Sequence, residues 1–419
     1  MNMGFAHALD LSDLKVVDQH CHIFPHASGT MTKDFFMRLM SLESYNPDYL
    51  LQQPSLNEHQ NGSMDERHHK GLKFDADSLI SMSERSAETT LLFKESVKEL
   101  AKFLRVVSSP ANVVAARNVR ATSNYELYVK DLFADARIQT MIVSDYPYLP
   151  YTDSGTFGGA SLRNKLVLPS MIFDIVDQST NLNEAVNHFQ SSVDEYLGKK
   201  GFVGIKSMIA YGGERRGSGL NIGNPSENDA AKGFALYKEK KGRVSGRQVK
   251  DMLDYFHRIA IGLATRFGRP FEFHTGIGDV DVVAEGCNPM LLVEMLQDEE
   301  IRHAKIILLH GGYPYVAEAG WITHFFPNVY LDSSIIFFTH YGAAIRRMEE
   351  MLEMAPYSKI LYSSDGMMPE LQWFSAKFAK RVMSAVLEHL IGSGTLDEAE
   401  ATDLAKSYFH ANSEALYSL

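Results

Sequence analysis

The chain has 419 residues, 45% of them hydrophobic and 22% charged, so it can bury a large core and is not disordered by composition. A formal net charge of -11 without a long Lys/Arg cluster argues against nucleic acid as a partner, because nucleic-acid binding needs a positive surface. Cys21 and Cys287 are too few for a disulfide framework. Because the sequence shows no secretory signal and no apolar run of about 18 residues, we expect a cytoplasmic protein that does not span a membrane. Small molecules are its expected partners. The sequence does not determine the oligomeric state, so both a monomer and a homo-oligomer stay open.

Eight apolar runs of strand length recur along the chain. Many are β-branched and bounded by Gly, Pro, Asn or Asp, which is typical of buried strands. They are Lys15 to Asp18, Gln139 to Ser144, Lys165 to Phe173, Phe202 to Ile209, Pro270 to Phe273, Ala304 to Leu309, Asn328 to Leu331 and Lys359 to Ser363.

Helical spacing separates several of these runs and indicates β-α alternation, hence a parallel sheet. The clearest helices are Gln248 to Phe267, Met290 to Leu296, Ala343 to Met354 and Ala376 to Ile391. Eight such units predict a (β/α)8 TIM barrel that occupies residues 1–419 as one domain. An open doubly wound sheet is the alternative, but no Gly-rich phosphate turn follows the first strand.

A long segment, residues 26–125, separates the first two predicted strands and exceeds a normal barrel connection. We interpret it as a mostly helical insertion. Its polar piece Gln52 to Lys73 predicts a loop, and Ala87 to Leu104 predicts an amphipathic helix. Four residues would share the apolar side of this helix: Leu91, Leu92, Val97 and Leu100. Insertions after a barrel strand lie over the mouth of the site, so a lid is our hypothesis for this segment.

The first predicted strand ends in Asp18-Gln19-His20-Cys21-His22. Because strand side chains alternate, His20 and His22 should point the same way and Cys21 the other way. Two imidazoles on one side can begin a site for a zinc-like cation. With 16 histidines in the chain, such a pair also arises by chance and is weak by itself.

Three further predicted strands end in residues of the same kind, namely His274, His310 and Asp365. Each follows an apolar run at its C-terminal end, where barrel enzymes place their catalytic groups. The alternative is that each histidine is a hydrogen-bonded core residue and Asp365 caps a helix. Four such ends in one chain favour a metal site.

Several stretches resemble the amidohydrolase superfamily, in particular amidohydrolase-related family 2 and its nodulin-like domain, which some proteins fuse to a glutamine-synthetase-like domain. The stretches are Asp18 to His22, His274-Thr275-Gly276-Ile277-Gly278-Asp279, His310-Gly311-Gly312-Tyr313-Pro314 with Phe326 to Asp332, and Ser363-Ser364-Asp365-Gly366 with Pro369-Glu370. This resemblance implies one or two divalent metal ions, zinc above all, held by His20, His22, His274 and Asp365, with His310 beside them or among the ligands. Asp365 would also accept the proton of the attacking water.

Lys206 interrupts the apolar fourth predicted strand. Superfamily members with two metals carry a carboxylated lysine on this strand as a bridging ligand, which makes Lys206 a candidate metal ligand. The alternative is an unmodified lysine that pairs with a carboxylate or contacts the substrate. Both interpretations stay open, and with them the number of metal ions.

Tyr211 and Arg216 resemble a family segment that binds substrate through a tyrosine followed at once by an arginine. Here Gly212 to Arg215 intervene, so Arg215 or Arg216 can equally be a surface residue. An arginine in the pocket would suit a substrate carboxylate. Three more acidic residues near predicted strand ends, which could support the ligands or cap helices, are Asp145, Asp174 and Asp279.

These features favour a hydrolase that cleaves a carbon-nitrogen bond of a small amide or lactam-like compound, with metal-activated water as nucleophile and His310 polarising or holding the carbonyl oxygen. A non-oxidative decarboxylase of a carboxylated ring compound, which uses the same ligand set in this family, is the second hypothesis. A non-catalytic barrel that binds metal or metabolite is the third.

Overall fold

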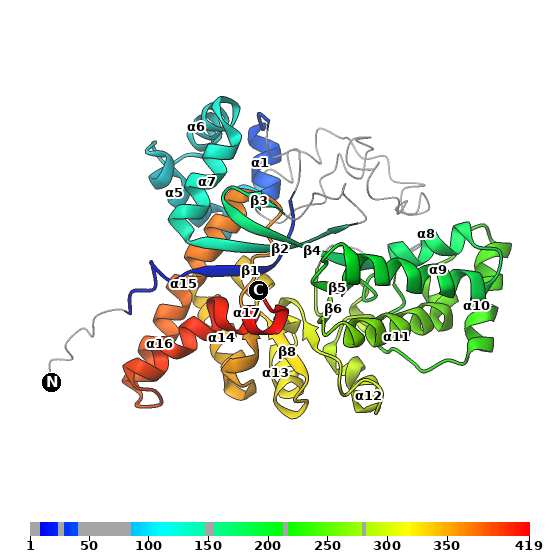
Figure 1. Ribbon diagram of the computed structural model, residues 1–419. Coiled ribbons are helices and arrows are strands. Elements are labelled where there is room, and N and C mark those ends of the chain that lie inside the picture. Colours follow the sequence, from blue (N-terminus) through cyan, green and yellow to red (C-terminus); the bar gives the residue numbers. More distant parts are fainter. Residues whose placement is uncertain (1–8, 24–28, 41–84, 147–154, 213–216, 279–281) are drawn as a thin grey trace.

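The computed structural model describes residues 9–23, 29–40, 85–146, 155–212, 217–278 and 282–419 (Figure 1). Its sheet contains eight parallel strands that pair in chain order, and β3 (Thr156–Phe157) adds an antiparallel pairing to β4. The parallel strands are β1 (Val16–Cys21), β2 (Ile138–Tyr146), β4 (Ala160–Leu168), β5 (Gly204–Ser207), β6 (Phe271–Phe273), β7 (Ile306–Leu308), β8 (Val329–Asp332) and β9 (Ile360–Leu361).

The chain beyond β9 closes the sheet onto β1. The amide of Gln19 donates to the carbonyl of Tyr362 at 3.4 Å, and the amide of Asp365 donates to the carbonyl of His20 at 2.9 Å. The predicted (β/α)8 barrel is therefore confirmed, and the open doubly wound sheet is wrong. Closure matters for the site because it brings the ends of the first and last strands together.

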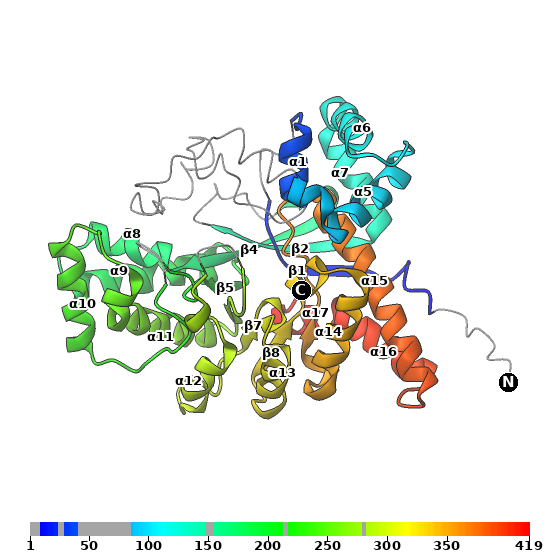
Figure 2. The same ribbon diagram turned by 180° about the vertical axis from the view of Figure 1, so that it is seen from behind.

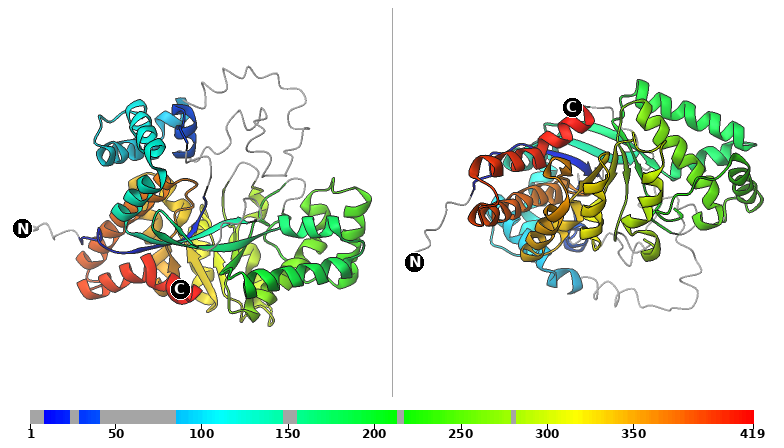
Figure 3. Two further views of the ribbon diagram at one scale, coloured as in Figure 1. Left: turned by 45° about the horizontal axis from the view of Figure 1, so that its top comes forward. Right: turned by 90° about the horizontal axis from the view of Figure 1, so that it is seen from below.

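Helices surround the strands, as the view from below in Figure 3 shows. Those that follow β4 to β9 are α8 (Ser170–Gln178), α9 (Leu182–Asp194), α10 (Glu227–Glu239), α11 (Lys250–Arg266), α12 (Val293–Gln297), α13 (Val316–Phe325), α14 (Tyr341–Met354), α15 (Pro369–Gly392), α16 (Glu398–Lys406) and α17 (Asn412–Tyr417). None of the helices in the described ranges is long and apolar enough to cross a membrane.

Strand alternation divides the core into two regions. In β7, Ile306 and Leu308 belong to the large cluster between strands and helices, whereas Ile307 belongs to a second, smaller cluster inside the barrel. This inner cluster also contains Ile142, Val203, Leu309, Leu361, Leu416 and Tyr417. The last two residues come from α17, so this helix contributes side chains to the barrel interior.

The largest difference between the predicted and the observed strand bounds is at β4. We expected a strand over Lys165 to Phe173, but β4 ends at Leu168 and α8 begins at Ser170, just beyond Pro169. The apolar run continues because α8 also buries its inner side against the barrel. Periodicity alone does not separate a buried strand from a short buried helix.

The segment after β1 is helical where it is described. It contains α1 (Lys33–Met40), α5 (Leu91–Leu104), α6 (Pro110–Ser123) and α7 (Tyr125–Ala136), of which α1, α5 and α7 pack against α15 (Figures 1 and 2). The predicted helix over Ala87 to Leu104 is interrupted at Thr90, whose side chain caps α5. Leu91 is 60% exposed, so its predicted place on the buried side is wrong, whereas Leu92, Val97 and Leu100 are buried. The histidine-containing loop, His59, His68 and His69, lies outside the described residues.

Candidate metal centre

His20, His22 and Asp365 form a group that can share one metal ion. Oδ1 of Asp365 lies 3.2 Å from Nε2 of His20 and 3.4 Å from Nε2 of His22. Two ligand atoms at about 2.0–2.1 Å from a tetrahedral ion are about 3.3 Å apart, so these separations suit a zinc-like cation. The side chains of His22 and Asp365 are 19% and 18% exposed, which leaves this side of the group open to a substrate.

His20 of β1 and His22, just beyond its end, both point toward Asp365, and Cys21 points away, with its Sγ 3.8 Å from the carbonyl of Ile142. The predicted alternation is therefore present at these positions. The pairing of β1 with β2 shifts register between Asp18 and Cys21. This irregularity lets Gln19 also face other strands of the barrel, where its amide contacts Asp332.

Lys206 lies beside the same group, with its Nζ 3.0 Å from Nε2 of His20. Because an ammonium only donates, Nε2 of His20 must accept and carries a lone pair. The ring hydrogen is then on Nδ1, which faces Ser144 Oγ at 3.1 Å and Glu272 Oε2 at 3.4 Å. This tautomer is the one that a ligand bonded through Nε2 requires.

His274 and His310 stand next to each other behind this group, with ring centroids 4.3 Å apart. Nδ1 of His310 lies 3.8 Å from Asp365 Oδ2, and the His310 ring lies 5.6 Å from the His20 ring. Within the described residues, Nε2 of His274 and Nε2 of His310 are buried without a hydrogen-bond partner. Buried nitrogens without partners are costly, and a cation would satisfy them, so this donor set fits a divalent metal.

Hydrogen bonding also sets the tautomer of His310. The hydroxyl of Ser334 donates to Asp332 Oδ1 at 2.7 Å, so at 2.7 Å from His310 it accepts from Nδ1. Nε2 of His310 then carries a lone pair. This geometry favours His310 as a ligand or proton acceptor over a donor to a carbonyl oxygen.

Two of the site residues have left-handed backbone, His310 with φ 68° and Asp365 with φ 49°. Such a conformation costs a non-glycine residue about 1–3 kcal/mol and needs support from its surroundings. Asp332 accepts from the amide of His310 at 2.9 Å, and Asp18 accepts from the amide of Ser364, just before Asp365, at 2.9 Å. Strained backbone at these two strand ends aims their side chains into the barrel mouth.

The charge states suit metal binding. Burial lowers the pKa of His20 and His310, and it lowers the pKa of His274 to about 3, so the three imidazoles are neutral at pH 7. Burial by itself raises the pKa of Asp365, but a proton shared with the facing His310, His20 and His22 holds this pKa well below its usual range. A metal would therefore meet neutral nitrogens and a carboxylate.

Two buried charged residues beneath the histidines had no role in the sequence prediction. Lys165 of β4 donates to both oxygens of Glu272 of β6 at 2.7 Å, and Glu272 lies directly below His20. Glu272 interrupts an apolar strand as Lys206 does, and that signal could have identified it. Asp332, which ends β8, supports His310 and Ser334 in a similar way.

Of the other residues that the sequence predicted near the site, one borders the histidine cluster and one lies away from it. Tyr211 is buried with its hydroxyl 3.4 Å from Nδ1 of His274, so it borders the histidine cluster. Asp174 is exposed in the interior of α8, which makes its expected roles as support or cap wrong. Arg215, Arg216 and Asp279 lie outside the described residues. For Asp145 the structure describes the backbone, in β2, but not the side chain.

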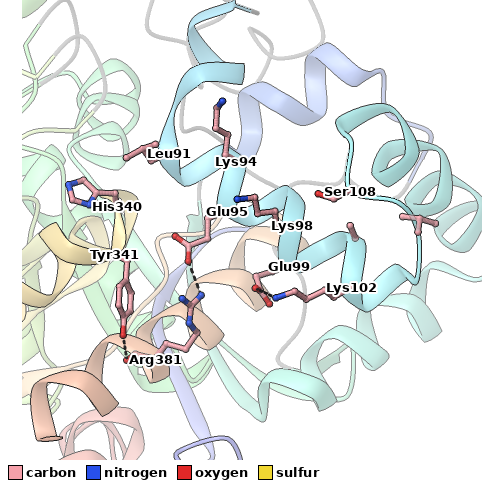
Figure 4. Close-up of a pocket in the computed structure, with 12 residues that line it drawn as sticks. Leu91, Lys94, Glu95, Lys98, Glu99, Lys102, Ser108, His340, Tyr341 and Arg381 are labelled. Carbon is pink, nitrogen blue, oxygen red and sulfur yellow. Dashed lines mark hydrogen bonds and ion pairs between the residues drawn. The ribbon is translucent and has the colours of Figure 1, made fainter. Parts of the chain in front are cut away.

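A separate surface groove of about 590 Å³ lies between α5 and the helices α14 and α15 (Figure 4). Two ion pairs border it, Glu95 with Arg381 at 2.8 Å and Glu99 with Lys102 at 2.7 Å. Its lining contains none of the histidines of the barrel mouth. We therefore place the candidate site at the strand ends.

A parallel barrel with histidines and an aspartate at the ends of its strands defines a class of metal-binding barrel proteins. The Amidohydrolase family model matches residues 189–419, and the chain belongs to this family. Members are mostly metal-dependent enzymes of varied chemistry. The matched part includes Lys206, His274, His310 and Asp365, whereas His20 and His22 precede it.

Comparisons with individual proteins agree with the family. Protein fluG of Emericella nidulans is 24% identical over 385 residues, which are 84% of this chain and 44% of fluG, so the chain spans less than half of that relative. A crystal structure from Lactobacillus casei ATCC 334, provisionally classed as a metal-dependent hydrolase, has a TM-score of 0.76, 23% identity and coverage of 98% of this chain and 97% of its own. A uronate isomerase from Bacillus halodurans has a TM-score of 0.63, 14% identity and coverage of 97% and 94%. Both structures show the same fold.

Proposed function

We propose that this protein is a metal-dependent hydrolase that cleaves the carbon-nitrogen bond of a small amide or lactam-like compound. The observation that carries the proposal is the position of Asp365, whose Oδ1 lies 3.2 and 3.4 Å from the Nε2 atoms of two histidines on the solvent-accessible side of the cluster. His20, His22 and Asp365 would hold the ion, with His274 and His310 beside them. Zinc suits this nitrogen-rich donor set.

A divalent cation held by His20, His22 and Asp365 would supply an acidified water and a Lewis acid for a carbonyl oxygen. Asp365, which is ionised, takes the proton from the attacking water and delivers it to the leaving nitrogen. Nε2 of His310 carries a lone pair and is buried without a hydrogen-bond partner, which supports a role as ligand or proton acceptor. Tyr211 borders His274 and, with Arg216, would orient the substrate.

Lys206 decides the number of ions. We propose that Lys206 stays an unmodified ammonium, that a single ion is bound, and that Nζ, now 3.0 Å from Nε2 of His20, leaves this nitrogen when the ion binds. A carboxylated Lys206 would instead bridge two ions. Metal analysis of the purified chain gives one ion per chain in the first case. Two ions with loading that depends on bicarbonate would support the bridge.

The experiment that tests the proposed function is turnover by metal-free and zinc-reloaded protein on a panel of small amides, lactams and esters. We expect hydrolysis that needs the metal and that Asp365→Asn abolishes. The panel includes a hexuronate because uronate isomerases share this fold. Metal binding without turnover on any compound would overturn the hydrolase and favour the non-catalytic barrel.

Decarboxylation of a carboxylated ring compound is the second candidate. The observation that favours it is again Lys206, because a single ion next to a lysine ammonium places an extra positive charge where a substrate carboxylate could bind. Carbon dioxide release from hydroxybenzoate-type acids, without amide hydrolysis, would support this candidate over the hydrolase.

A further inference from the structure

The barrel interior below the metal centre is filled partly by α17. Leu416 and Tyr417 belong to the inner cluster together with strand residues such as Ile307 and Leu361. The helix contacts β1 and β9, and Figure 1 shows it beside β1 in the middle of the molecule. Tyr417 is 1% exposed, so its ring and hydroxyl lie inside the barrel.

The hydroxyl of Tyr417 reaches the layer directly below the histidines. It lies 2.7 Å from Oε1 of Gln19 and also within hydrogen-bond distance of Oε1 of Glu272. Gln19 precedes His20 in β1, and Glu272 is two residues before His274 in β6. The hydroxyl has a single hydrogen, which the charged carboxylate of Glu272 attracts more strongly than the neutral amide oxygen of Gln19 does, so Tyr417 donates to Glu272.

Lys165 holds Glu272 from the other side. Its ammonium has three hydrogens, and three acceptors lie at 2.7 Å, namely both oxygens of Glu272 and the carbonyl of Gln19. Although Lys165 Nζ is 3.3 Å from Nδ1 of His20, it has no hydrogen left for that nitrogen. Nδ1 of His20 is thus free to donate toward Ser144 Oγ at 3.1 Å and Oε2 of Glu272 at 3.4 Å, and the lone pair of Nε2, which accepts from Lys206 at 3.0 Å, is the one that a cation would take.

We propose that Tyr417 is a positioning residue for the metal centre, because it fixes Glu272 so that this carboxylate orients His20. The inference rests on the proposed metal site and deepens it. Tyr417 and Lys165 together determine where the two oxygens of Glu272 lie. Without the hydroxyl, Glu272 keeps its pairing with Lys165 but loses its second fixed contact, so its oxygen can rotate away from Nδ1 of His20.

The test uses Tyr417→Phe, which removes the hydroxyl and keeps the ring in the inner cluster. Zinc affinity is measured on the full chain by competition with a chromophoric chelator, and the visible absorption of the cobalt-loaded protein reports ligand geometry. We expect affinity to fall about 10-fold, the lower end of the range for partners that orient metal ligands, together with a changed cobalt spectrum.

Tyr237→Phe is the matched control. Tyr237 is fully buried, and its hydroxyl donates to Asp177 Oδ1 at 2.9 Å in the helical layer outside the barrel. It should lose a comparable hydrogen bond and leave zinc affinity and the cobalt spectrum unchanged. An equal affinity loss in both variants would show a general stability effect and overturn the inference.

A double-mutant cycle with Glu272→Gln tests whether Tyr417 acts through Glu272. If it does, Tyr417→Phe adds little to the affinity loss of Glu272→Gln, whereas full additivity contradicts the mechanism. Should Tyr417→Phe not fold, Glu272→Gln alone carries the test, since unchanged zinc affinity in that variant excludes the proposed route. Absence of metal binding by the wild-type chain overturns the proposed function. Wild-type binding that Tyr417→Phe leaves intact overturns this inference alone.

Discussion

Nε2 of His20 and Oδ1 of Asp365 lie 3.2 Å apart, although His20 lies in the first strand of the barrel and Asp365 follows the last one. A lone-pair nitrogen and a carboxylate oxygen repel each other at this distance unless a cation is shared between them. The relationship between these residues depends on closure of the barrel, because only the chain after β9 brings Asp365 to β1.

Asp365→Asn should lower turnover by at least about 100-fold, because it removes both a ligand charge and the proton acceptor. Circular dichroism should show an intact fold. Asp298→Asn is a suitable control, since this carboxylate pairs with Arg258 at 2.7 Å far from the histidines. Full activity in Asp365→Asn would show that Asp365 takes no part in the reaction.

The stability of the protein should fall as the pH falls below about 6.5, and His257 supplies a clean probe. Burial lowers the pKa of His257 to about 4, and its ring is bonded to Ser207 Oγ at 2.8 Å and to the carbonyl of Leu253 at 2.7 Å. Between pH 6.5 and 4 the His257 imidazole is protonated in the unfolded chain and neutral in the folded chain. The stabilisation is therefore complete above the unfolded pKa and lost on acidification, by at most about 1.4 kcal/mol per pH unit.

Urea unfolding at pH 7.5 and 5.5 measures this effect. His257→Gln should reduce the difference in the free energy of unfolding between the two pH values. The buried histidines of the metal centre, whose pKa values are lowered as well, add to the slope in the same direction. An unchanged pH difference in His257→Gln would contradict the assignment.

Arg117 and Glu370 form a fully buried ion pair at 2.8 Å that joins α6 to the start of α15. Arg117 also donates to the carbonyl of Gly29, in the chain that follows β1. Arg117→Met should therefore lower the free energy of unfolding by about 3–5 kcal/mol, because it leaves a buried carboxylate without its cation.

The matched variant for this prediction is Lys102→Met, which breaks the Glu99 pair at 2.7 Å where Lys102 is 72% exposed. Its cost should be about 0–1 kcal/mol. Chemical denaturation compares the two variants directly. Similar small losses in both would mean that the buried pair does not anchor the helical segment.

Gly278 lies against the histidine cluster, and a Cβ added there would be 2.4 Å from the hydroxyl of Tyr211 and 2.6 Å from Cε1 of His274. Gly278→Ala should displace one of these side chains and weaken zinc affinity or turnover by about 10-fold. Gly262→Ala is the control, because its added Cβ in α11 would meet nothing within 4 Å outside the local helix backbone, and it should stabilise the helix by about 0.5–1 kcal/mol. Normal metal affinity in Gly278→Ala would show that the backbone around Gly278 can shift to accommodate the methyl group without moving His274.

The sequence by itself determined the eight parallel strands and the ligand-type residues at their ends. Alternation in a strand is a local property of the backbone, so His20 and His22 could be placed on one side without knowledge of any other strand. The same holds for His274, His310 and Asp365, since parallel strands of a barrel end at the same mouth. Where the apolar pattern was ambiguous, as between β4 and α8, the sequence placed the boundary wrongly.

Only the tertiary structure decided which groups lie beneath and around those ligands. Lys165, Glu272 and Tyr417 meet inside the barrel because register and closure bring three distant parts of the chain together. Hydrogen-bond partners across strands follow from that register, and no local pattern encodes it. The tautomers of His20 and His310, and therefore the directions of their lone pairs, depend on those partners.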